Sequence, residues 1–138
     1  MGKKTKTVTT WKSGNAFSST SNGHTIEADS DGFGMKALLL AGLSGCSGVD
    51  VVSILEKMRV PFADLKITAE TEQTDTDPKV FKDIRLTFTV RTEAENEDKV
   101  RKAIELSLEK YCGVSAMLRK NSKIDYTLVI EEESGVQS

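Results

Sequence analysis

The sequence predicts an α+β domain in which an antiparallel sheet packs against a long central helix. Alternating apolar and polar residues, with turn residues between them, mark strands near both ends and in the middle of the chain. The segment 35–58 is too long for a strand and is apolar on nearly every side. A second helical pattern lies between the last two strands. Runs of strands interrupted by two principal helices are typical of α+β proteins.

The first 30 residues are expected to form three short strands. Their approximate ranges are 6–12, 16–20 and 24–29. Clusters of Ser, Gly and Asn at residues 13–15 and 20–23 separate them, and these residue types favour tight turns. The opening of the chain therefore indicates a three-stranded meander.

The segment 35–58 is expected to be a central helix enclosed by protein. Gly42, Gly45 and Gly48 each cost about 0.8–1.0 kcal/mol relative to Ala in a helix interior, so we expect another backbone to approach closely there. Pro61 ends the helix, because the residue before a proline is biased away from the helical conformation. Asp50 and several Gly and Ser residues interrupt the apolar stretch, which argues against a membrane span.

The second half of the chain adds two strands, a helix, a helical turn and a last strand. Alternation predicts the strands at 65–69, 84–90 and 124–130. Thr92 and Glu95 form a possible capping box for a helix that runs to Cys112, with Gly113 as its C-cap. A short turn at 115–118 follows. The predicted order is βββ-α-ββ-α-(α)-β.

Composition limits the class of protein further. The 138 residues suffice for one domain, 1–138, in which 1–5 and 132–138 are expected to be flexible tails. A formal net charge of −2 provides no basic surface for nucleic acid. Because no apolar stretch follows the charged N-terminus, we expect no secretory signal, a cytoplasmic location and reduced cysteines.

The two cysteines, Cys46 and Cys112, are the distinctive chemical groups. They and the single His24 lack the close ligand pairs of a zinc site, so no metal is expected. The glycines near Cys46 lie inside a helix without the lysine of a phosphate loop, so no nucleotide cofactor is expected either. The thiols are either inert buried groups or a redox pair. Their separation of 66 residues (112 − 46 = 66) leaves that choice to the fold.

Position along the helices suggests roles for a redox pair. Cys112 is expected at a helix C-terminus, whose negative dipole end disfavours a thiolate, so it suits the resolving role. Cys46 is expected in mid-helix with Asp50 one turn later, a charge that opposes ionisation of the thiol. A nearby cation would therefore be needed at Cys46.

Three stretches, residues 38–46, 50–55 and 106–114, resemble the OsmC/Ohr family, and most closely its branch of OsmC-like redox proteins. The resemblance implies an intertwined homodimer in which sheets from both chains wrap the two central helices. It implies reduction of organic hydroperoxides in oxidative stress defence, with electrons from a dithiol reductant. Cys46 matches the peroxidatic cysteine, which forms a sulfenic acid, and Cys112 matches the resolving cysteine, which forms a disulfide with it.

Two lysines occupy the positions where the family's peroxidases carry their activating pair. Lys12 falls at or near the site of an arginine that activates the thiolate, and Lys36 at or near the site of a glutamate that holds this arginine. Both are candidates to stabilise a thiolate at Cys46. The alternative interpretation is a noncatalytic module of the same family that binds a small hydrophobic or sulfur-containing ligand.

Overall fold

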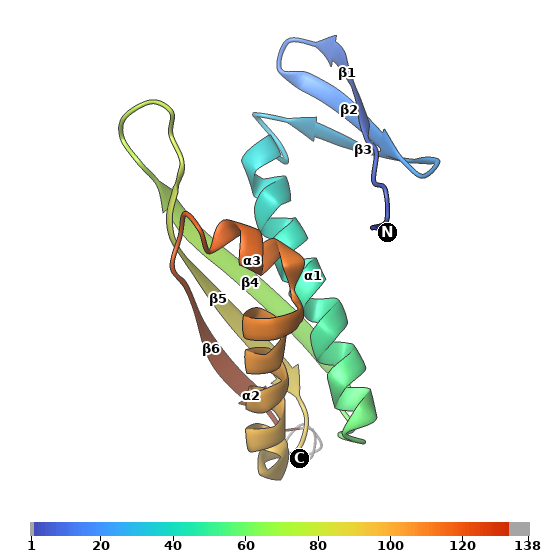
Figure 1. Cartoon of the computed structure of the whole chain (residues 1–138), viewed down its shortest axis with the longest axis vertical. Helices are drawn as coiled ribbons and strands as arrows, with labels where there is room; N and C mark the ends of the chain where they lie inside the picture. Colours follow the sequence, from blue (N-terminus) through green and yellow to red (C-terminus); the bar gives the residue numbers. More distant parts are fainter. Residues whose placement is uncertain (1, 133–138) are drawn as a thin grey trace. The chain divides into compact units, whose positions relative to one another are not determined.

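The computed structural model describes residues 2–132; Met1 and residues 133–138, which include most of the expected C-terminal tail, lie outside the described residues. The chain forms two compact units, 1–39 and 40–138. The elements follow the predicted order βββ-α-ββ-α-(α)-β, with two additional short turns of helix (Figure 1). The α+β class is therefore confirmed, and the assignment of the whole chain to a single domain stays a prediction.

The first unit contains the predicted meander. Its strands are β1 (Val8–Ser13), β2 (Ala16–Ser21) and β3 (His24–Asp29), paired antiparallel in that order. The two-residue connection between β2 and β3 is Asn22-Gly23, and both residues have positive φ, at 53° and 79°. This geometry favours Asn followed by Gly and matches the right-handed twist of the strands. The turn residues thus explain the register between β2 and β3.

The long helix α1 spans Met35–Lys57. It ends before Pro61, at a turn in which Arg59 has a φ of 60° and the Val60 amide donates to the Leu55 carbonyl. By length and composition α1 could cross a membrane, a test that the core helix of a soluble protein also passes. Only 22% of its most apolar window is buried. Among the described residues, the expected enclosure of the helix is therefore not observed.

The second unit contains a mixed sheet. Its strands are β4 (Asp64–Gln73), β5 (Phe81–Arg91) and β6 (Ile124–Glu131), in the order β4-β5-β6. β4 pairs antiparallel with β5, whereas β6 is parallel to β5, so the prediction of an antiparallel sheet was wrong for this strand. The physical reason is the helical crossover between β5 and β6, which returns the chain to the end of the sheet where β5 begins.

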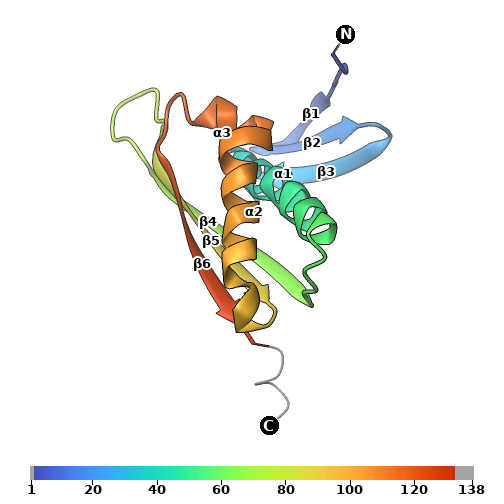
Figure 2. The ribbon, with the colours of Figure 1, turned by 60° about the horizontal axis from the view of Figure 1, so that its bottom comes forward.

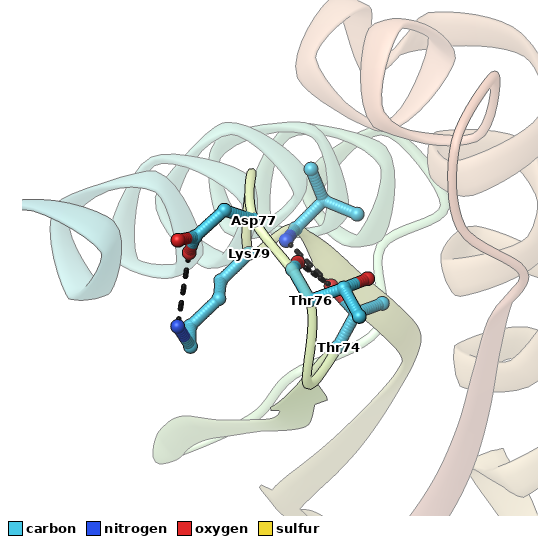
Figure 3. A network of polar contacts seen from close by, with 5 residues as sticks. Thr74, Thr76, Asp77 and Lys79 are labelled. Atoms are coloured by element: carbon cyan, nitrogen blue, oxygen red, sulfur yellow. Dashed lines mark hydrogen bonds and ion pairs between the residues drawn. The ribbon is translucent and has the colours of Figure 1, made fainter.

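The loop between β4 and β5 is held by its own polar contacts (Figure 3). The Thr74 amide donates to the Val80 carbonyl at 2.8 Å, and the Val80 amide donates back to the Thr74 hydroxyl at 3.1 Å. At the tip, Lys79 pairs with Asp77 at 2.9 Å. These contacts define the turn that joins the two strands.

The predicted second helix is divided into several pieces. They are the 3₁₀ turn η1 (Ala94–Asn96), the helix α2 (Glu97–Leu106) and the π-helical turn η2 (Ser107–Tyr111). The separate helix α3 (Gly113–Leu118) confirms the helical turn that the sequence predicts at 115–118. The capping box was wrong. Thr92 is 1% exposed. Its hydroxyl donates to the Pro61 carbonyl at 2.6 Å and accepts a hydrogen bond from the side-chain amide of Asn96 at 3.0 Å. A buried hydroxyl needs hydrogen-bond partners. The Thr92 hydroxyl finds them in Pro61 and Asn96, so it does not cap the first turn of the helix.

The core lies where α1 and α2 cover one face of the β4-β5-β6 sheet (Figure 2). β5 is the central strand, and its alternate side chains point into this core, as the sequence predicts. Residues of α1 and α2 complete it. The fully buried members include Leu43, Val51, Leu55, Ile84, Leu86, Phe88, Val90, Val100, Ala103 and Ile104.

We expect Thr92→Val to lower the free energy of unfolding by about 1–3 kcal/mol, because it removes the hydroxyl that bonds to the Pro61 carbonyl and to the Asn96 side-chain amide. Urea unfolding followed by circular dichroism measures the change. Thr127→Val is the matched control, since Thr127 is exposed on β6. Equal unfolding midpoints for the two variants would contradict the prediction.

Candidate functional site

Cys46 lies in the middle of α1, on the side that faces the rest of its unit. Leu43, Ser47 and Val51 form a buried stripe on this side of the helix, and Cys46 lies beside them. The cysteine is half-buried and packs against the hydrophobic core. The thiol is therefore held by the helix and is still partly accessible.

Cys112 lies at the junction between η2 and α3 and is only 3% exposed. Its amide donates to the Ser107 carbonyl at 2.7 Å, and its sulfur accepts from the Ser115 amide at 3.4 Å. The predicted position of Cys112 at the end of the second helical segment is confirmed, since Cys112 directly follows η2, whereas the prediction of Gly113 as C-cap was wrong. The π turn ends the preceding helix, and Gly113 is instead the first residue of α3.

The fold brings the two thiols close enough to influence each other. Burial raises the pKa of the Cys112 thiol to about 11, and a hydrogen bond to Cys46 acts in the same direction. Both effects favour the protonated form of Cys112. Both cysteines are free thiols. The tertiary proximity that a redox pair requires is thus present, and the catalytic roles of the two residues stay predictions.

A buried polar cluster adjoins the thiol pair. The Ser47 and Ser107 hydroxyl oxygens lie 2.8 Å apart, and both residues are fully buried. The Ser107 hydroxyl also donates to Asp50 Oδ2 at 3.1 Å. Sequence reasoning treated Asp50 only as a charge near Cys46, and here it is a hydrogen-bond acceptor. The sequence signal for this cluster was Ser107, a polar residue on the otherwise apolar face of the second helical pattern.

Arg119 is a second feature that sequence reasoning missed. Its guanidinium donates to the Leu108 carbonyl and, at 2.8 Å, to the Ser115 hydroxyl. The Ser115 hydroxyl in turn donates to the same Leu108 carbonyl at 2.7 Å. These donors satisfy a carbonyl of the π turn and fix the start of α3, where Cys112 lies. The spacing of four residues between Ser115 and Arg119 was the only sequence signal.

The candidate cations Lys12 and Lys36 both belong to residues 1–39. Lys12 lies in β1, and its ammonium pairs with Glu27 of β3 at 3.1 Å. Lys36 lies in the first turn of α1, ten residues before Cys46. The role of either lysine toward the Cys46 thiolate stays a prediction. Within residues 2–132, no three His, Cys, Asp or Glu side chains are placed to hold a metal ion.

Two grooves flank the cysteine-bearing part of α1. The larger has a volume of about 670 Å³ and runs between α1 and β4. Its lining is Ser44, Gly45, Gly48, Val49, Val52, Ser53, Glu56, Leu65 and Ile67. The smaller, of about 380 Å³, lies between α1 and the π turn and is lined by Asp50, Ser53, Ile54, Lys57, Leu106 and Tyr111. Neither cysteine lines either groove.

The raised pKa of Cys112 predicts a loss of stability at alkaline pH. Between about pH 9 and pH 11 the folded chain keeps a proton on Cys112 that the unfolded chain releases, so the free energy of unfolding falls as pH rises. The fall should be on the order of 2 kcal/mol. Urea unfolding under reducing conditions across this window measures it. Cys112→Ser is the control, and a parallel fall in that variant would contradict the assignment.

Comparison with known proteins identifies the family. Residues 28–127 match the family described as OsmC-like protein. Protein YhfA of Escherichia coli K12 is 35% identical over 123 residues, which cover 85% of this chain and 91% of the relative. A hypothetical protein of Aquifex aeolicus VF5 has a similar structure, with a TM-score of 0.82, 30% identity and coverage of 94% of this chain and 99% of that chain.

A more distant structural relative has a functional name. It is the organic hydroperoxide resistance protein OsmC of Legionella pneumophila, with a TM-score of 0.66, 15% identity and coverage of 92% of this chain and 97% of that chain. At this identity the likeness concerns the fold alone. The matched range and the identity to YhfA, taken together, show that the chain belongs to the OsmC-like family.

Proposed function

We propose that the protein is a thiol-dependent peroxidase that reduces organic hydroperoxides in oxidative stress defence. The observation that carries the proposal is the proximity of Cys46 and Cys112, two thiols 66 residues apart in the sequence (112 − 46 = 66) that interact closely enough for Cys46 to raise the pKa of Cys112. Membership of the OsmC-like family supports it, because organic hydroperoxide resistance proteins share the fold.

The proposed reaction needs only the two sulfurs and a reductant. The Cys46 thiolate attacks the terminal oxygen of the hydroperoxide, the O–O bond breaks, and the sulfur becomes a sulfenic acid. The expelled alkoxide takes up the proton that the thiol released on ionisation and leaves as the alcohol. The Cys112 thiol then condenses with the sulfenic acid, which forms a disulfide and releases water. A dithiol reductant returns two electrons by thiol–disulfide exchange and is itself oxidised to a disulfide. No cofactor takes part.

Burial supports this division of roles. A peroxidatic thiol must meet its substrate first, and Cys46 is the more accessible of the two cysteines. Cys112 is 3% exposed, and its raised pKa keeps it protonated at neutral pH, which makes it a poor initial nucleophile. It needs to react only with an oxidised sulfur beside it. Cys112 therefore suits the resolving step.

Two further parts of the proposal concern charge and substrate. Lys12 and Lys36 are the proposed cations that favour a thiolate at Cys46, and the ion pair with Glu27 gives Lys12 a defined position within its sheet. Cys46 packs among apolar side chains. An alkyl tail would gain from contact with such a surface, so organic hydroperoxides should react faster than hydrogen peroxide.

The proposed partner is a second copy of the chain, and the proposed location is the cytoplasm. α1 is apolar on most sides, yet only 22% of its most apolar window is buried among the described residues, and Val49 is 71% exposed. Val49 lies in the groove of about 670 Å³ between α1 and β4. An exposed apolar surface of this kind marks an interaction site. The family resemblance favours a homodimer as its occupant.

The same groove supports the second candidate function. Its lining is largely apolar, and neither cysteine belongs to it. In a chain that does not dimerise, this groove would remain open to a small hydrophobic or sulfur-containing ligand. The protein would then be a noncatalytic binding module.

We expect Cys46→Ser to abolish hydroperoxide turnover, because no other thiol is placed to attack first. Cys112→Ser should still undergo one oxidation at Cys46, without recycling, because the sulfenic acid lacks its partner. Mass spectrometry after one equivalent of cumene hydroperoxide measures these outcomes. We expect a mass loss of two hydrogens in the wild type, one added oxygen in Cys112→Ser and no change in Cys46→Ser.

A known thiol peroxidase serves as the control for this experiment. If the wild-type cysteines stay reduced while the control protein is oxidised, the peroxidase proposal fails and the binding module takes its place. Oxidation of Cys112 in the Cys46→Ser variant at the wild-type rate would reverse the two roles.

The homodimer proposal predicts that Val49→Glu weakens association, because it places a charge in the exposed apolar groove. Sedimentation velocity at micromolar concentration should show a dimer for the wild type and a larger monomer fraction for the variant. Val129→Glu is the matched control, since Val129 is 42% exposed on β6. A folded wild-type monomer at this concentration would contradict the proposal.

A further inference from the structure

We propose that Ser107 is a positioning residue for the thiol pair, and that its contacts with Ser47 and Asp50 determine how readily Cys46 and Cys112 form a disulfide. The inference rests on the proposed thiol chemistry and deepens it. It concerns the geometry of the pair, so it can be tested even if a hydroperoxide is not the oxidant.

The backbone of Ser107 holds Cys112. Ser107 is the first residue of the π turn, and its carbonyl accepts the Cys112 amide at 2.7 Å. This bond spans five residues, as a π turn requires, and it closes the turn directly before the cysteine. The position of Cys112 therefore follows the position of Ser107.

The side chain of Ser107 holds α1. Its hydroxyl donates to Asp50 Oδ2 at 3.1 Å and lies 2.8 Å from the Ser47 hydroxyl oxygen. The Ser47 carbonyl, at 3.4 Å, is a second and more distant acceptor for the same hydrogen. A hydroxyl has one hydrogen, so donation to either acceptor leaves Ser47 as the donor in its hydroxyl contact with Ser107. Ser47 directly follows Cys46, and Asp50 lies one turn later. One residue thus connects the two cysteine-bearing segments, through its carbonyl to Cys112 and through its hydroxyl to the neighbours of Cys46.

Burial makes these contacts costly to lose. Ser47 and Ser107 are both fully buried, so removal of the Ser107 hydroxyl leaves the Ser47 hydroxyl without its present acceptor and Asp50 without a charge-assisted bond. A small shift of the π turn against α1 would follow. Disulfide bonds tolerate little displacement, since the bridged Cα atoms usually lie about 4.4–6.8 Å apart. The equilibrium between dithiol and disulfide should therefore respond to the loss.

The test compares Ser107→Ala with the wild type in buffers of reduced and oxidised glutathione. We expect the equilibrium constant for the Cys46–Cys112 disulfide to fall at least about tenfold, the factor that corresponds to one lost hydrogen bond of this kind. Ser107→Thr, which restores a hydroxyl, should recover most of the loss. Ser122→Ala is the matched control, because Ser122 is a buried serine that donates to the Phe81 carbonyl and not to the π turn.

Other outcomes decide against the inference. A disulfide equilibrium in Ser107→Ala within twofold of that in Ser122→Ala would overturn it. If Ser107→Ala does not fold, Asp50→Asn replaces it, since the amide keeps the shape and weakens the acceptor, and an unchanged equilibrium there would also overturn the proposal. Oxidation of Cys46 by cumene hydroperoxide, measured in Cys112→Ser, tests the peroxidase function separately from this geometry.

Discussion

The contact of one stripe of α1 with β5 and the segment after α2 is the interaction on which this structure depends. Leu43, Val51 and Leu55 of the stripe are fully buried in the core, and Ser47 at its centre bonds to Ser107. The contact orients Cys46 toward the interior. It also fixes the π turn that carries Cys112. The core residues and the thiols share this face of the helix, so a change in core packing also changes the positions of the thiols.

The large elements were predictable because their physical causes are local. The alternation along β5 follows from a strand with one face in the core, and the long apolar run of α1 admits only a helix. The Asn22-Gly23 turn specifies its hairpin through backbone conformation alone. These signals lie within a few residues of each other in the sequence.

The features that were missed depend on tertiary contacts. Thr92 carries a capping signal, but burial beside the Pro61 carbonyl offers its hydroxyl a better partner. The π turn follows from the docking of Ser107 on α1, which no helical periodicity reveals. Cys46 and Cys112 were recognisable as a pair through family resemblance, whereas the serine and aspartate that connect their segments became visible only in three dimensions.

The parallel pairing of β6 has a consequence for the order in which the chain folds. β4 and β5 form a hairpin in which Gln73 faces Phe81, whereas the β5–β6 ladder begins with Ile84 opposite Ile124. Loop closure over so many residues is slow, so β6 should join the sheet after the hairpin and the intervening helices have formed. Cys46 and Cys112 are separated still further in the sequence. They become neighbours only when the segment after α2 docks on α1, so an oxidant that reaches the chain before this docking should meet two separate thiols.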